Sequence, residues 1–160
     1  MKIHLPTRLR DTLLASLQSA GRREIGGVLM GEHIGAEEFR IADLTVQRRS
    51  GALAFFVRLV TEAAAKLRAF FDRTQHDYTR YNYLGEWHSH PGFALSPSGK
   101  DMDTMLDIVT DPDVGANFAV LMIVRLSTEG ALEARATAFL PDQKSLLCEV
   151  HMETEHEVQA

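Results

Sequence analysis

An uninterrupted apolar run from Phe118 to Leu126 constrains the fold of this chain more than any other segment. Its sequence, FAVLMIVRL, contains a single charged residue. A strand with one wet face alternates apolar and polar residues, whereas a continuous apolar run is typical of a strand buried on both faces. We therefore expect this run to form an interior strand of a sheet.

Further strands and helices flank the run, and they alternate irregularly along the chain. Apolar alternation and turn residues predict strands at 24–35, 37–47, 53–59, 81–90, 131–141 and 146–150. Apolar residues at helical spacing predict helices that begin near Thr7, Thr61 and Ser98. The expected architecture is a mixed sheet with helices packed on it.

Size, charge and cysteine content exclude several classes of protein. The 160 residues allow one domain, and a net charge of −5 argues against a nucleic-acid binder, which usually carries a basic stripe. A single cysteine, Cys148, excludes a disulfide framework and a cysteine zinc ribbon, and we expect it to be a buried thiol. Neither a membrane span nor an export signal is recognisable, so we expect a cytoplasmic protein without a membrane partner.

His88 and His90 stand two residues apart on the predicted strand 81–90. Alternate side chains of a strand share a face, so both imidazoles point the same way and could grip a zinc ion. A His-x-His pair alone is equally typical of two half-buried histidines.

Ser98 and Asp101 follow the histidine pair with the spacing of a helix capping box. Taken alone, Ser-x-x-Asp before an amphipathic helix favours a cap. The two interpretations are compatible, because a first helical turn that faces the strand end would bring the Asp101 carboxylate to the histidines. Two histidines and one carboxylate leave one zinc position open, which is the arrangement of a catalytic site.

Glu24 is the candidate general base for a zinc-dependent hydrolase. It precedes a glycine pair, which allows another backbone to approach closely. Taken alone, the position of Glu24 favours a solvated charge at a strand end.

The pattern Glu24 … His88-Ser89-His90-Pro91-x6-Ser98-x-x-Asp101 resembles the JAMM (MPN+) motif of JAB-domain metalloproteases. The spacing matches at every required position, and the order of elements matches over about residues 7 to 150. The resemblance implies a single JAB/MPN domain over 1–160, an α/β (α+β) fold in which helices flank a curved mixed sheet, similar to cytidine deaminases.

The resemblance also implies roles for the motif residues. His88, His90 and Asp101 would bind one Zn²⁺, Glu24 would transfer the proton of the attacking water, and Ser98 would help to stabilise the oxyanion. The implied substrate is the bond after the C-terminal glycine of a ubiquitin-like protein. Stand-alone bacterial members often occur beside E1- and E2-like (activating and conjugating) proteins, some in antiviral defence, and this context is the one we favour.

Three alternatives compete with this hypothesis. A zinc deaminase shares the fold, but it needs a Pro-Cys-x-x-Cys ligand pair that one cysteine cannot supply. Processing of a sulfur-carrier protein would use an identical active site. A non-catalytic MPN scaffold would normally have lost ligands, and none is missing here.

The segment 47–57 is the candidate binding site for the tail of the substrate. An extended tail is readily held by addition of a strand to a sheet edge. Arg48 and Arg49 would contact an acidic group of the partner, and the small residues Ser50, Gly51 and Ala52 would permit close backbone approach. The backbone N–H groups of Ala52 and Ala54 would donate hydrogen bonds to the tail. A surface loop without any contact to substrate is the alternative.

Overall fold

Eight strands and three helices make up the described part of the chain, residues 1–48 and 52–154 of the computed structural model. The helices are α1 (Thr7–Ala20), α2 (Ala52–Arg73) and α3 (Gly99–Thr110). The strands are β1 (Lys2–Leu5), β2 (Ile25–Gly35), β3 (Glu38–Leu44), β4 (Gln47–Arg48), β5 (Tyr81–Ser89), β6 (Ala119–Leu126), β7 (Leu132–Phe139) and β8 (Ser145–Met152).

The strands form one mixed sheet, as the sequence predicted, and their order in it is β3-β1-β8-β7-β6-β5-β2-β4. The sheet also closes on itself, because β2 pairs with β3 as well as with β5. Strand β6 lies parallel to β5 and antiparallel to β7. Since β5 and β6 are parallel neighbours, the chain must cross over between them, and α3 forms this crossover.

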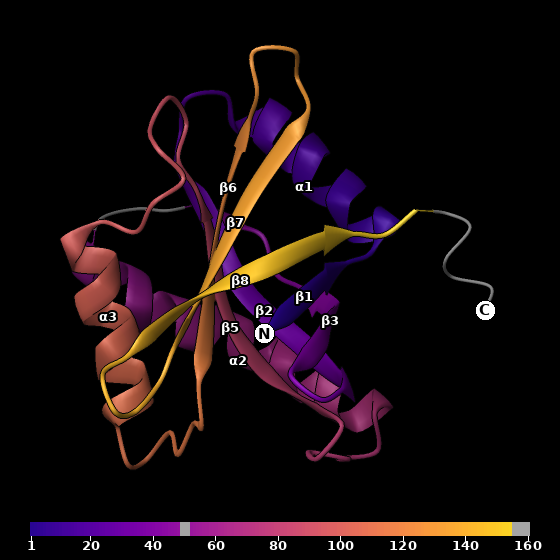
Figure 1. The fold of residues 1–160 in the computed structure, drawn as a ribbon, viewed down its shortest axis with the longest axis vertical. Coiled ribbons are helices and arrows are strands. Elements are labelled where there is room, and N and C mark those ends of the chain that lie inside the picture. The colour runs from indigo at the N-terminus through magenta and orange to yellow at the C-terminus, as the bar shows by residue number, and fades with distance from the viewer. Residues whose placement is uncertain (49–51, 155–160) are drawn as a thin grey trace.

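Strand β6 is buried on both faces, as its apolar run predicted. Val120, Met122 and Val124 belong to one hydrophobic cluster, which also contains the buried residues of α1. Leu121 and Ile123 belong to a second cluster, which contains the buried residues of α3. The two clusters therefore lie on opposite faces of the sheet, and Figure 1 shows α1 and α3 on opposite sides of it.

Residues near both ends of the chain take part in the sheet. Strand β1 is inserted between β3 and β8 and runs parallel to both. The Thr7 hydroxyl donates a hydrogen bond of 2.8 Å to the Glu153 carbonyl, which ties the start of α1 to the end of β8. The sheet thus extends beyond the expected core of 7–150 at both ends.

The strand predicted at 53–59 is wrong, because the backbone from Ala52 to Arg73 is one helix. A short apolar run is ambiguous between a strand and a buried helix. The run continues without glycine or proline to Arg73, and its alanines and leucines favour a helix. The helix predicted from Thr61 therefore begins nine residues earlier. In the described part of the chain, no helix is long and apolar enough to span a membrane.

The backbones of β2 and of the segment after β3 approach each other closely at Gly27. A Cβ atom there would lie 1.9 Å from the Thr45 carbonyl oxygen. Thr45 is buried, and its carbonyl accepts a 2.8 Å hydrogen bond from the Trp87 indole. Gly27 thus allows Thr45 to hold both β2 and the central tryptophan of β5.

We expect Gly27→Ala to destabilise the protein by about 1–3 kcal/mol, because the added methyl group forces backbone apart in a packed region. The free energy of unfolding, measured by chemical denaturation, checks this. Gly99→Ala is the control, since a Cβ at Gly99 meets nothing within 4 Å. Equal stability of Gly27→Ala and the wild type would contradict the close approach.

Candidate metal centre

Strand β5 presents the two histidines at its carboxyl end. His88 lies on the strand, and His90 directly follows it, with its backbone N–H donating to the Val124 carbonyl of β6 at 2.9 Å. His88 is 4% exposed and His90 is 9% exposed. The intervening Ser89 faces the other way, and its hydroxyl accepts a 3.0 Å hydrogen bond from the backbone N–H of Ile25. This contact ties the start of β2 to the strand end that carries the histidines.

Asp101 enters the site from the first turn of α3. Its Oδ2 atom accepts hydrogen bonds from the Ser98 backbone N–H at 2.8 Å and from the Ser98 hydroxyl at 2.6 Å. The Asp101 backbone N–H donates to the Ser98 hydroxyl in return, which completes the predicted capping box. The carboxylate is only 6% exposed and faces both histidines, so the cap and the site share this residue.

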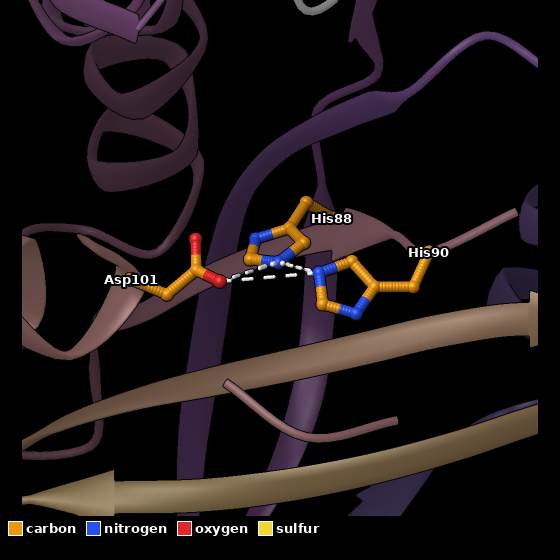
Figure 2. A group of neighbouring side chains, drawn as sticks. All are labelled: His88, His90 and Asp101. Atoms are coloured by element: carbon orange, nitrogen blue, oxygen red, sulfur yellow. Dashed lines mark hydrogen bonds and ion pairs between the residues drawn. The ribbon is translucent and has the colours of Figure 1, made fainter. Parts of the chain in front are cut away.

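The three side chains converge on one point, as Figure 2 shows. The His88 and His90 Nε2 atoms lie 3.0 Å apart, and they lie 3.6 and 3.9 Å from Asp101 Oδ2. A point equidistant from these three atoms lies about 2 Å from each, which is the length of zinc bonds to nitrogen and carboxylate oxygen. The donor set and its spacing therefore fit a zinc ion.

A backbone carbonyl orients the His90 ring. His90 Nδ1 lies 2.7 Å from the Ala94 carbonyl oxygen, which can only accept a hydrogen bond. A proton on Nδ1 leaves the Nε2 lone pair free in the neutral ring, and Nε2 is the atom that faces the other two ligands. Metal-binding histidines in proteins commonly have a partner of this kind.

Glu24 lies immediately before β2 and is exposed. The β2–β5 register pairs Gly26 with His88. Extended by two residues beyond the strands, this register would bring Glu24 opposite His90, on the face of the sheet that carries the two histidines. Its role as a base stays a prediction, as does the role of Ser98 at the oxyanion.

The residues predicted to bind the substrate tail do not form one extended edge. Arg48 ends β4, where its backbone pairs with Ile25. Arg49 lies outside the described residues, and Ala52 and Ala54 lie in the first turn of α2. A helical backbone cannot add a strand, so the edge pairing expected at these alanines is wrong. Contact of these four residues with a substrate stays a prediction.

Two contacts beside the histidines were not predicted from the sequence: that of His90 Nδ1 with the Ala94 carbonyl, and that of Arg125 Nη1, which donates to the Phe93 carbonyl at 2.9 Å. A Pro-Gly turn signal at 91–92 and a charge inside an apolar strand were the available signs. Cys148 is buried as expected, and burial raises the pKa of its thiol, which disfavours a nucleophilic role.

Comparison with known families decides the classification. The family of prokaryotic homologues of the JAB domain matches residues 6–139. The chain belongs to this family. The predicted JAB/MPN fold, an α+β arrangement of a mixed sheet flanked by helices, is thereby confirmed.

Individual proteins are also similar to this chain. A CD-NTase/cGAS isopeptidase of Enterobacter hormaechei subsp. hoffmannii is 27% identical over 130 residues, which are 79% of this chain and 69% of the relative. A protein of Desulfitobacterium hafniense, 17% identical, shares the fold over 99% of both chains with a TM-score of 0.61. A protein of Salinibacter ruber, 21% identical, matches 97% of this chain and 93% of its own with a TM-score of 0.53.

We expect the purified protein to bind about one zinc ion per chain and to lose it in His88→Ala or Asp101→Ala, because two remaining ligands hold zinc weakly. Elemental analysis after dialysis measures the content. His76→Ala removes a histidine that is half exposed and outside the cluster, and it should keep the metal. Full zinc content in both His88→Ala and Asp101→Ala would show that these two residues do not bind the metal.

We expect Ser98→Ala to lower the free energy of unfolding by about 1 kcal/mol, because the variant removes the side-chain half of the α3 cap. Thermal and urea denaturation of the zinc-free protein measure this effect apart from metal binding. Thr104→Ala is the control within the same helix, since the Thr104 hydroxyl only bonds to the Lys100 carbonyl one turn earlier. A loss no larger than that of Thr104→Ala would contradict the capping role.

Proposed function

We propose that this chain is a zinc-dependent isopeptidase that hydrolyses the amide bond after the C-terminal glycine of a ubiquitin-like protein. The convergence of His88, His90 and Asp101 on one point carries the proposal. Three protein ligands leave a position open for water or substrate, which is typical of catalytic zinc sites. Similarity to a protein named an isopeptidase supports the type of bond.

A zinc ion at this site would supply Lewis acidity to water and to the scissile carbonyl. If the β2–β5 register is extended by two residues, the Glu24 carboxylate would lie on the face of the sheet that carries the two histidines. In the proposed reaction Glu24 accepts a proton from the attacking water and returns it to the leaving amine. The hydrogen bond from Ile25 to Ser89 fixes the backbone next to Glu24, which limits the positions that its carboxylate can reach.

Ser98 has two roles in this proposal, and the structure supports the first more directly. Its hydroxyl donates to Asp101 Oδ2 and thereby orients a metal ligand. To stabilise an oxyanion, the same hydroxyl must turn from the carboxylate to the substrate, because it carries a single proton. We therefore assign the larger share of oxyanion stabilisation to the metal.

A conjugate or a precursor of a ubiquitin-like protein is the proposed substrate, encoded with E1- and E2-like partners in a bacterial conjugation system that serves antiviral defence. The relative named an isopeptidase supports a protein conjugate over a sulfur-carrier precursor. The complete ligand set supports an enzyme over a non-catalytic scaffold.

The test uses two substrates: a ubiquitin-like protein joined through its terminal glycine to a lysine side chain, and a sulfur-carrier protein with a C-terminal extension. Cleavage of the first that a chelator abolishes and zinc restores supports the proposal. Cleavage of the second alone favours the sulfur-carrier alternative. A zinc-loaded protein that cleaves neither substrate favours a scaffold.

We expect Glu24→Gln to keep zinc and the fold but to lower kcat by about 10²- to 10⁴-fold, the range that follows the loss of a general acid–base group. Steady-state cleavage of the conjugate measures kcat and KM. Glu129→Gln makes the same change at an exposed turn between β6 and β7 and should leave kcat unchanged. Activity of Glu24→Gln within a few-fold of the wild type rejects Glu24 as the base.

A further inference from the structure

The chain reverses direction directly after the second histidine. The Phe93 backbone N–H donates to the His90 carbonyl at 3.2 Å, and Gly92 has a φ of 81°. Proline at the second position and glycine with positive φ at the third are the signature of a type II turn. The turn His90-Pro91-Gly92-Phe93 returns the chain so that the next carbonyl, that of Ala94, lies against the His90 ring.

Strand β6 holds both ends of this turn. At one end, the Val124 carbonyl accepts the His90 backbone N–H at 2.9 Å. At the other end, Arg125 Nη1 donates to the Phe93 carbonyl at 2.9 Å. Arg125 lies opposite Glu133 in the β6–β7 register, and its Nε donates to the Glu133 carboxylate. One guanidinium group therefore connects the neighbouring strand to the loop beside the metal centre.

We propose that Arg125 is a positioning residue for the metal centre: by fixing the Phe93 carbonyl, it holds the adjoining Ala94 carbonyl on His90 Nδ1. This hydrogen bond keeps the imidazole proton on Nδ1, so the Nε2 lone pair faces His88 and Asp101. The inference rests on the metal-binding part of the proposed function and not on the identity of the substrate. Arg125 acts through His90 and touches neither metal nor substrate.

The exposure of the Arg125 and Glu133 side chains distinguishes a positioning role of Arg125 from a contribution to the stability of the fold. The Arg125 and Glu133 side chains are 36% and 39% exposed, and ion pairs with this exposure add little to stability. Partners that orient metal ligands, in contrast, commonly change metal affinity by roughly 10- to 100-fold when they are removed. The loss of Arg125 should therefore affect the metal centre more than the fold.

The test begins with zinc-free protein labelled with ¹⁵N at histidine. Two-bond proton–nitrogen correlation spectra distinguish the two neutral tautomers of His90. The wild type should show the Nδ1-protonated form, and Arg125→Ala should show a mixture. Competition with a chromophoric chelator should then give roughly tenfold weaker zinc binding for Arg125→Ala, with a thermal midpoint close to that of the wild type.

Two further variants make the result specific. Arg135→Ala removes an exposed arginine from the next strand and should change neither the tautomer nor the zinc affinity. Glu133→Gln alone should weaken zinc binding less than Arg125→Ala does. Combined with Arg125→Ala, it should cause no further loss of zinc affinity, because its effect passes through Arg125. This variant also preserves the test if Arg125→Ala fails to fold.

The tautomer measurement decides the inference independently of the proposed enzyme. An unchanged His90 tautomer in both Arg125→Ala and Glu133→Gln overturns it, whatever their activity. If the wild type binds no zinc, the proposed function fails, and the effect of Arg125 on the His90 tautomer can still be read.

Discussion

The candidate metal centre depends on the Asp101 carboxylate, which connects the cap of α3 to the two histidines. One of its oxygens accepts two hydrogen bonds from Ser98 and also faces the Nε2 atoms of His88 and His90. A buried carboxylate is costly unless it has hydrogen-bond donors, and the helix cap supplies them without a metal. The protein thus holds the proposed metal ligand in place by an interaction that the fold of α3 itself requires, so the side chain is already oriented without a metal.

The topology of the chain explains why this helix terminus meets this strand end. Strands β5 and β6 are parallel, so the chain that leaves β5 must return along α3 before it enters β6. The N-terminus of α3 consequently lies at the edge of the sheet where β5 ends. In sheets with parallel strands, ligand sites usually occur outside the carboxyl ends of the strands. The crossover therefore brings Asp101 to the histidines although it lies eleven positions after His90 in the chain.

Local patterns in the sequence predicted the parts of the fold and site that depend on few neighbouring residues. The apolar run of β6, the same-face histidines and the Ser98–Asp101 cap are of this kind, and the structure confirms the geometry of each. The start of α2 could not be predicted, because a short apolar run suits a buried strand as well as a helix. The contact between Arg125 and the Phe93 carbonyl joins residues 32 positions apart, and no local pattern encodes such a pair.

The contacts that orient Asp101 and those that hold the turn after His90 differ in their separation along the chain, which affects the order in which the centre assembles. The Ser98 cap and the Pro91–Gly92 turn are local, so each can form as soon as α3 and the end of β5 form. The contacts from Val124 and Arg125 need β6 to pair with β5, which is a long-range event. Local contacts cost less loop-closure entropy than long-range ones. The local contacts can therefore orient Asp101 before the sheet is complete, whereas the turn after His90 receives its contacts from Val124 and Arg125 only when β6 pairs with β5.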